Sequence, residues 1–372
     1  MLLLAGLLTV YTASFAVGYL EYGSTNYFVV RQAAYAIVGV CALVYFMRLD
    51  YRQLRHLAVP MMVVALLGLL AVLIPGIGVE RNGARRWLEL GPVSFQPSEF
   101  AKLAIIIYIS AWLAGRKEIS KFSLGLVPFV LMVSLVGGLV IVEPDMGTAI
   151  IIVLTTSTLF FVAGAPLSHL ALLMASGGAV SYFMILVQDY RLDRITSFVS
   201  PESDPQGNGF HILQLLIALG SGGVTGLGWG VSRQKFFYVP GAHTDGVFAI
   251  IGEELGFIGL AGILALFAFF VFRGLKATYA SKDQFGTLLG IGIVSWIAYQ
   301  TLINVGGITR SIPLTGVPLP FLSYGGSALI AVMAGAGVLL SVSRYGRGRG
   351  ERPKPRAQRY ARSRAAAEKE AR

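Results

Sequence analysis

A polar loop turns directly into an apolar helix in the stretch Tyr238-Val-Pro-Gly-Ala-His-Thr-Asp-Gly-Val-Phe-Ala-Ile-Ile-Gly-Glu-Glu-Leu-Gly-Phe-Ile-Gly259. His243, Thr244 and Asp245 stand side by side at the start of this helix, in a chain of which only 13% is charged. The local pattern favours an ordinary role for Asp245, because an aspartate ahead of a helix caps the free backbone N–H groups of its first turn. The alternative is a functional carboxylate, which the rest of the chain supports.

The whole chain is built on apolar runs of this kind. Of its 372 residues 55% are hydrophobic, and the runs approach the ~20 residues that a helix needs to cross a bilayer. Backbone groups in lipid must find partners within the chain, which makes helices the default element. The predicted fold class is therefore an all-α polytopic integral membrane protein. About ten transmembrane helices are expected, at 2–20, 28–47, 57–75, 97–114, 123–142, 146–163, 168–187, 246–272, 285–307 and 322–343.

Basic residues predict the orientation of these helices, because Lys and Arg concentrate on the cytoplasmic side of a membrane. With this rule both termini are expected in the cytoplasm, and the net charge of +11 is explained without a nucleic-acid partner. The predicted organisation is a single transmembrane domain, 1–343, followed by a basic, disordered tail, 344–372. The long loop 188–245, between spans 7 and 8, is expected outside the cytoplasm. The cytoplasmic basic clusters lie at 48–55, 116–121, 273–282 and in the tail.

Arginine and lysine are also frequent in the loops predicted outside, so an anionic ligand is expected there. Arg191 and Arg194 are three residues apart, so on a helix they project together and suit a diphosphate. The alternative is a surface face in which they pair with Asp189 or Asp193. The apolar residues between 210 and 217 predict an amphipathic helix in the same loop.

Lys102 lies about one turn inside the predicted span 97–114, on the same face as Glu99 three residues earlier. An ionisable residue within a membrane span is a functional candidate by default, and Glu99 is its predicted partner. Snorkelling of the Lys102 ammonium group to the headgroups is the alternative. The sequence leaves the two interpretations open.

Three further stretches have an ordinary interpretation beside a functional one. Glu143-Pro-Asp145 is typical of a tight turn. The glycine-rich stretch 220–230 either brings its backbone close to an anion or packs as a flexible loop. The proline-rich stretch Pro313–Ser327 cannot be a regular helix, and irregular backbone at membrane depth is tolerated only where it is buried or lines a cavity. The four histidines show no metal-ligand spacing.

Together these stretches resemble the SEDS family of shape, elongation, division and sporulation proteins, of the RodA/FtsW type. The resemblance extends from the N-terminus to about Arg344, and the run Gly228–Lys235 is more similar to the division branch (FtsW) than to the elongation branch (RodA). The chain departs from the family pattern at Gly241, Gly246 and Val247, beside the aspartate. The matching residues are Asn82-Gly-Ala-Arg-Arg-Trp87, Gln96-Pro-Ser-Glu99 with Ala101-Lys102, Glu143-Pro-Asp-Met-Gly-Thr148, Arg191 with Arg194, Asp204-Pro with Gly207, Gly220-Ser-Gly-Gly223, His243-Thr-Asp245, Glu253-Glu-Leu-Gly256 and Pro313 to Ser327.

The resemblance implies a ten-span glycosyltransferase of the bacterial cytoplasmic membrane. Such an enzyme polymerises lipid II into glycan strands at the outer face of the membrane, together with a class B penicillin-binding protein, which is a transpeptidase. The catalytic residue that the resemblance implies is Asp245. The candidate substrate-binding residues are Arg85, Arg86, Trp87, Glu99, Lys102, Arg191, Arg194, His243, Thr244 and Ser323.

The residue inventory fits this chemistry independently. Lipid II carries its disaccharide on a polyprenyl diphosphate, which leaves without protonation when cations stabilise its charge. The acceptor hydroxyl must lose a proton, and one carboxylate within reach serves as general base; a glycosidase would need two carboxyls. Asp245 as the single base suits inverting transfer, and a divalent cation, Mg or Mn, is left open. The alternatives are a lipid II flippase or transporter and a non-catalytic scaffold for a transpeptidase.

Overall fold

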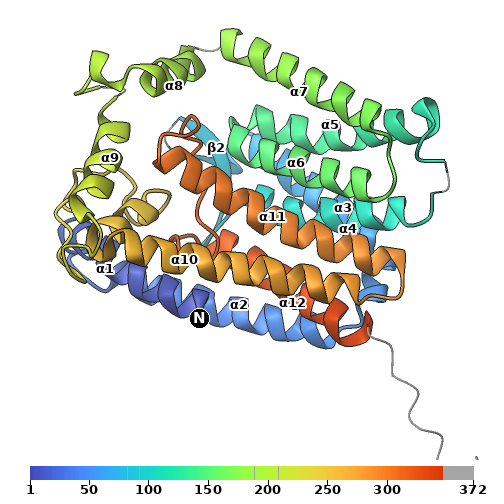
Figure 1. Cartoon of the computed structure of the whole chain (residues 1–372), viewed down its shortest axis with the longest axis horizontal. Helices are drawn as coiled ribbons and strands as arrows, with labels where there is room; N and C mark the ends of the chain where they lie inside the picture. Colours follow the sequence, from blue (N-terminus) through green and yellow to red (C-terminus); the bar gives the residue numbers. More distant parts are fainter. Residues whose placement is uncertain (82, 92, 117, 188, 208, 347–372) are drawn as a thin grey trace, which may run out of the picture.

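The computed structural model describes residues 1–346 except 82, 92, 117, 188 and 208. These residues contain twelve α-helices and one small sheet (Figure 1). Side chains at 183–193 are outside the description, and so is most of the predicted tail, 347–372. A wide helical turn, Phe122–Leu126, leads into α5. The helices are α1 (Leu2–Tyr22), α2 (Tyr27–Arg48), α3 (Tyr51–Leu73), α4 (Pro97–Leu113), α5 (Val127–Val142), α6 (Met146–Val162), α7 (Leu167–Val187), α8 (Asp189–Val199), α9 (Phe210–Gly222), α10 (Val247–Tyr279), α11 (Gln284–Ile308) and α12 (Gly326–Gly346).

The prediction of an all-helical polytopic membrane protein is confirmed. Seven helices in the described part are long and apolar enough to cross a membrane: α1, α2, α3, α5 with its preceding turn, α10, α11 and α12. Each of the ten predicted ranges lies on a helix, with α4, α6 and α7 corresponding to the remaining three.

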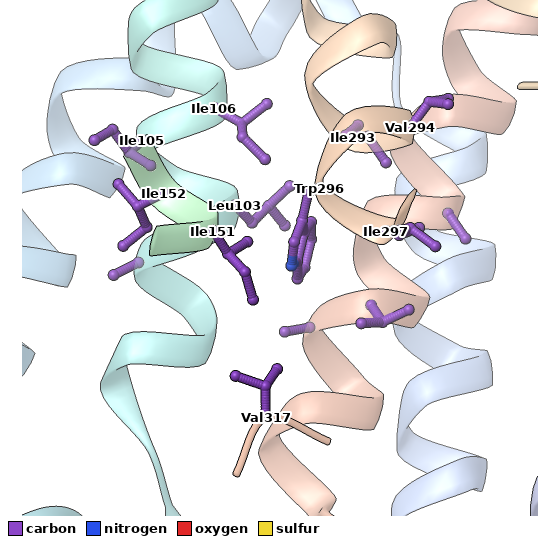
Figure 2. Close-up of a cluster of buried hydrophobic side chains, with 14 of the residues drawn as sticks. Leu103, Ile105, Ile106, Ile151, Ile152, Ile293, Val294, Trp296, Ile297 and Val317 are labelled. Carbon is purple, nitrogen blue, oxygen red and sulfur yellow. The ribbon is translucent and has the colours of Figure 1, made fainter. Parts of the chain in front are cut away.

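Helix α11 forms the centre of the bundle, as a sequence that is apolar on most of its faces predicts. In its most apolar window 72% of the residues are buried, against 17% in α10, which lies at the edge. Figure 2 shows Trp296 of α11 pointing toward Leu103 of α4 and Ile151 of α6, with Val317 at the end of the same cluster. Trp296 is fully buried. The core therefore reaches from the middle of the bundle to the irregular segment that follows α11.

A three-stranded antiparallel sheet lies between α3 and α4, formed by β1 (Gly78–Arg81), β2 (Ala84–Leu90) and β3 (Val93–Phe95). The region lies between the predicted spans 57–75 and 97–114, where the sequence predicts no strand. Arg81 pairs with Ala84, so the sequence between them, Asn82-Gly83, is the strongest short signal for a two-residue hairpin. The strands are too short for their alternation of polar and apolar residues to stand out among long apolar runs.

The predicted loop 188–245 contains the helices α8 and α9 among its described residues. A helix is present where one was predicted, between 210 and 217, but α9 is apolar and not amphipathic. The glycine-rich stretch after it packs against a break in α10 at Gly256 (φ 65°, ψ −166°). Leu227 N–H donates to the Glu253 carbonyl at 3.0 Å, and Phe257 N–H donates to the Gly223 carbonyl at 2.9 Å. A Cβ on Gly226 would lie 2.2 Å from the Glu254 carbonyl oxygen. The glycines therefore permit close backbone packing, which supports the packing interpretation of this stretch.

Two glutamates of α10 anchor the segment between the glycine-rich stretch and Asp245. Glu253 accepts hydrogen bonds from Ser232 Oγ (2.5 Å) and from the backbone N–H of Arg233 (3.0 Å). Glu254 pairs with Lys235 at 2.9 Å, and both side chains are at most 2% exposed. Removing one partner of such a buried pair leaves an uncompensated charge, at a cost of about 3–5 kcal/mol. These groups therefore fix the loop that carries the candidate base.

Candidate active site

Asp245 lies in the last turn before α10, and its carboxylate does not cap that helix. Gly246 occupies the N-cap position, with no side-chain cap. The turn is closed by backbone bonds from Thr244 N–H (2.9 Å) and Gly246 N–H (3.1 Å) to the Gly241 carbonyl. Thr244 Oγ1 donates to Asp245 Oδ1 at 2.9 Å. The helix-cap alternative for Asp245 is therefore wrong, because the helix begins one residue later than that alternative requires.

The Asp245 side chain faces a small pocket where three helices meet the irregular segment 309–325. Its accessible space is about 10 Å³, which is roughly the room that one water molecule needs. A disaccharide cannot enter without movement of these walls. The lining residues are His211 and Leu215 of α9, Asp245 and Gly246 before α10, Asn304, Gly307 and Ile308 of α11, and Leu314, Thr315, Gly316 and Val317.

Two histidines near Asp245 are held neutral by burial. Burial lowers the pKa of His243 to about 4, against a smaller opposing effect of the Asp245 charge. Burial also lowers the pKa of His211, where Asp245 raises it and Arg194 lowers it further. His211 Nε2 is buried and has no hydrogen-bond partner among the described residues. The pocket therefore offers an unpaired imidazole nitrogen beside the carboxylate, a contribution that the sequence did not predict.

The predicted neighbours of Asp245 lie on both sides of the pocket. Arg194 Nη1 donates to the Leu314 carbonyl at 3.0 Å, which places this guanidinium at the rim. His243 packs against Phe28, with ring centroids 4.5 Å apart, and its carbonyl accepts from Tyr324 N–H at 2.8 Å. The side chain of Arg191 lies outside the described residues, and so does its predicted projection beside Arg194.

Asn304 holds the backbone of Asp245 in place. Its Nδ2 donates to the Asp245 carbonyl at 3.0 Å and to the Val317 carbonyl at 2.8 Å. Trp296, Gln300 and Asn304 are spaced four residues apart on α11, so they share one face. Polar amides recurring at this spacing in an apolar span are the signal that could have identified them from the sequence.

Lys102 and Glu99 form the predicted pair inside the bundle. Lys102 Nζ lies 3.0 Å from Glu99, and the two side chains are 1% and 2% exposed. The snorkelling alternative is therefore wrong, because the Lys102 ammonium group is buried in protein. Lys102 also donates to Gln300 Oε1 at 2.9 Å, and Gln300 Nε2 donates to the Pro318 carbonyl at 2.9 Å. The pair thus supports the segment that lines the pocket and does not line it itself.

The candidates on β2 point to different partners. Arg85 Nε pairs with Glu80 at 3.2 Å on the exposed side of the sheet. Arg86 Nε donates to the Glu143 carbonyl at 3.0 Å, and its Nη2 donates to the Pro144 carbonyl. Trp87 is partly buried in the same strand. Arg86 therefore fastens the sheet to the link between α5 and α6.

That link is the turn that the sequence predicted. Asp145 caps α6, with its Oδ1 accepting from Thr148 N–H at 3.1 Å. Glu143 is fully buried, and neither carboxyl oxygen has a hydrogen-bond partner among the described residues. Burial and the charge of Asp145 raise the pKa of Glu143 to about 8, against a lowering by Arg86. Glu143 is thus a neutral acid at neutral pH.

The proline-rich segment is irregular, as predicted, and much of it is buried. Ser323 Oγ accepts from Leu319 N–H at 2.8 Å, and Gln32 of α2 donates to the Ser323 carbonyl at 3.2 Å. Ser323 therefore stabilises a turn behind the pocket. Among the described residues no group of three or more His, Cys, Asp or Glu side chains could hold a metal ion.

Comparison with known proteins connects this arrangement to a family. The family model described as "Cell cycle protein", for FtsW, RodA and SpoVE, matches residues 1–348. Stage V sporulation protein E of Bacillus subtilis (strain 168) is 43% identical over 348 residues, covering 93% of this chain and 95% of that protein. A protein named "Probable peptidoglycan glycosyltransferase FtsW" from Geobacter metallireducens is 38% identical over 339 residues, covering 91% of this chain and 90% of the relative.

Solved structures agree with these matches. A chain from a peptidoglycan synthase complex, described as coordinating polymerization and crosslinking, is 29% identical, with a TM-score of 0.74 and coverage of 91% of this chain and 97% of its own. The crystal structure of the rod shape determining protein RodA of Thermus thermophilus is also 29% identical, with a TM-score of 0.69. It covers 93% of this chain and 95% of its own length.

Proposed function

Because the chain belongs to the SEDS family of FtsW, RodA and SpoVE proteins, we propose that it is a peptidoglycan glycosyltransferase that polymerises lipid II. The observation that carries the proposal is the carboxylate of Asp245, which faces a pocket and is released from helix capping. An aspartate with a purely structural role in this position would accept hydrogen bonds from the backbone N–H groups in the first turn of α10.

Asp245 acts as the general base in the proposed reaction. Its carboxylate takes the proton of the acceptor sugar hydroxyl while that oxygen forms the new bond at the anomeric carbon of the donor, and the bond to the diphosphate breaks with inversion. The Thr244 hydroxyl holds Oδ1, which leaves Oδ2 for the acceptor. The unpaired Nε2 of His211 is placed to hydrogen-bond a sugar hydroxyl in the same pocket.

The leaving diphosphate needs cations, and Arg194 at the rim is the described candidate. A guanidinium provides a planar donor fork for phosphate oxygens. Binding requires Arg194 to exchange the Leu314 carbonyl for the diphosphate. The exchange would free Leu314, which lines the pocket of about 10 Å³, so that this wall can move, while Arg310 keeps the segment 309–325 on α8 through the carbonyls of Phe198 and Val199. Substrate binding and opening are therefore one event in this proposal.

Ten spans with both termini in the cytoplasm form the proposed topology, in one domain of residues 1–343 with the tail 344–372. Three further helices, α4, α6 and α7, add to the seven that qualify by length and composition. Asp245, the sheet and the segment 309–325 then share the outer end, and the basic links share the inner end. The active site is thereby proposed outside the cytoplasm.

A class B penicillin-binding protein is the proposed partner, since the related chain comes from a peptidoglycan synthase complex. The transporter alternative expects polar groups exposed along a passage. The buried Glu99–Lys102 pair does not fit this expectation, because the two side chains pair with each other, Lys102 also donates to Gln300, and both are closed off from solvent. The scaffold alternative does not require a carboxylate such as that of Asp245, which lines a pocket and does not cap a helix.

Purified protein in proteoliposomes that contain lipid II tests these functions together. Two readouts are needed, glycan polymer by gel electrophoresis and movement of labelled lipid II between leaflets, each with and without the cognate transpeptidase. The proposal expects polymer without accelerated movement. Movement without polymer would assign transport, and neither activity, even with the partner present, would assign a scaffold.

A further inference from the structure

A second and larger pocket lies at the other end of the bundle, at the starts of α3 and α11. Arg52, Arg55, His56, Asp283 and Phe285 line it. Its volume of about 460 Å³ falls within the ~300–1,000 Å³ of small-molecule sites. Asp245 precedes α10, whereas this pocket follows the far end of the same helix, so the two sites are separated by its full length. The pocket is therefore independent of the proposed transferase site.

Asp283 provides the one carboxylate among the described residues that line this pocket, and both of its oxygens are engaged. Asp283 Oδ1 caps α11 by accepting from Gly286 N–H at 2.8 Å, and Oδ2 accepts from the Tyr51 hydroxyl. Arg52 Nε lies 3.7 Å from the same carboxylate and offsets its charge. Among the described residues Asp283 thus contributes no free negative charge to the pocket.

Arg55 supplies the excess positive charge. A Cβ on Gly115 would lie 3.6 Å from Arg55 Nη2, which places the guanidinium against the link after α4. No hydrogen bond or ion pair is found for the Arg55 side chain within the part of the chain that the structure describes. Its planar fork is available for two oxygens of one phosphate.

An apolar surface continues directly from this pocket. Val59, Val63 and Leu67, which recur every four residues after Arg55 on α3, are 59%, 48% and 60% exposed. Exposed aliphatic side chains on a membrane helix face acyl chains. A ligand with a phosphate in the pocket and an apolar tail along α3 would satisfy both features, whereas a free phosphate would use only the first.

We propose that this pocket binds the phosphate group of an anionic glycerophospholipid, with Arg55 as the principal ligand and the acyl chains along α3. The site differs from general attraction of basic residues to a membrane surface, because it depends on one guanidinium in a defined pocket. Arg273 of α10 provides the comparison, since it is an exposed cation near the same end of the bundle that does not line the pocket.

Binding of short-chain phosphatidylglycerol to the detergent-solubilised full chain tests the proposal, measured by native mass spectrometry and thermal shift without lipid II. Short-chain phosphatidylcholine and inorganic phosphate are the comparison ligands. Arg55→Gln should weaken phosphatidylglycerol binding about tenfold or more, the value of a hydrogen bond between charged groups. Arg273→Gln should change it less than twofold. Arg55→Lys, which keeps the charge and loses the fork, should give an intermediate loss and covers the case in which Arg55→Gln does not fold.

Equal losses in Arg55→Gln and Arg273→Gln would overturn the proposal in favour of non-specific surface charge. Inorganic phosphate binding as tightly as the lipid, with the same dependence on Arg55, would overturn the lipid assignment. Phosphatidylcholine binding as tightly as phosphatidylglycerol would overturn the requirement for an anionic headgroup. None of these outcomes depends on transferase activity.

Discussion

Adding a methyl group at Gly241, as in Gly241→Ala, should lower kcat and leave KM nearly unchanged. It has a left-handed backbone (φ 65°), and a Cβ there would lie 2.5 Å from Asp245 Oδ1 and 2.8 Å from Thr244 Oγ1. Ordinary contacts begin at 3.4 Å. In Gly241→Ala the carboxylate must therefore move by about 0.9 Å or the turn must change.

The expected cost follows from this displacement. A misplacement of about 1 Å in a reacting group lowers the rate by about 100-fold, which corresponds to about 2.7 kcal/mol. A residue with a side chain in left-handed conformation adds about 1–2 kcal/mol of destabilisation. The Arg194 contact at the pocket rim is not touched, so KM should stay within about threefold. The expected result is a selective loss of kcat.

Steady-state polymerisation of lipid II, with kcat and KM determined separately, provides the assay. Gly230→Ala is the matched control, because Gly230 has φ 78° in the same loop and a Cβ there meets nothing within 4 Å. It shares the backbone cost and lacks the clash. An unchanged kcat in Gly241→Ala, or equal losses in the two variants, would refute the positioning of Asp245 described above.

Three other changes have definite expected outcomes. Lys102→Met should lower the free energy of unfolding by about 3–5 kcal/mol, and the double variant with Glu99→Leu should recover part of it in thermal denaturation; no recovery would contradict the pairing. Asn304→Leu should lower the kcat of protein that is still fully folded at the assay temperature, because Asn304 holds the Asp245 carbonyl. A lower melting temperature with an unchanged kcat would contradict this role. Burial lowers the pKa of His243 to about 4. Between about pH 6.5 and pH 4 the unfolded chain therefore binds more protons at this residue than the folded chain does. The free energy of unfolding is unaffected by His243 above about pH 6.5 and falls by about 3 kcal/mol toward pH 4. His243→Asn should weaken the pH dependence of the denaturation midpoint over this range. An unchanged pH dependence would contradict the lowered pKa of His243.

The sequence was sufficient for the helices because each span is a long apolar run. It also identified the Glu99–Lys102 pair, since two opposite charges three residues apart inside a span have few alternatives. The local sequence pattern favoured Asp245 as the N-cap of α10, which is wrong. Helix α10 begins at Val247, one residue later than such a cap requires, and this depends on the turn closed at Gly241. The contribution of His211 was missed for another reason. It comes from packing α9 against the pocket, a tertiary contact that no local pattern encodes.

The sheet shows the same limit. Its hairpin signal, Asn82-Gly83, was present in the sequence, but apolar runs dominated the interpretation. Asn304 and Gln300 were missed in the same way. Their spacing of four residues is a signal in the sequence, but their partners, the carbonyls of Asp245, Val317 and Pro318, are known only from the structure.

The central claim is that Asp245 is the general base of glycan polymerisation, and kcat of Asp245→Asn for purified lipid II tests it most directly. Glu118→Gln is the matched control, since Glu118 is an exposed carboxylate paired with Lys121 far from the pocket. The account predicts that Asp245→Asn remains folded and loses about 100- to 10,000-fold in rate, while Glu118→Gln keeps its activity. A folded Asp245→Asn that polymerises lipid II at the wild-type rate would contradict it.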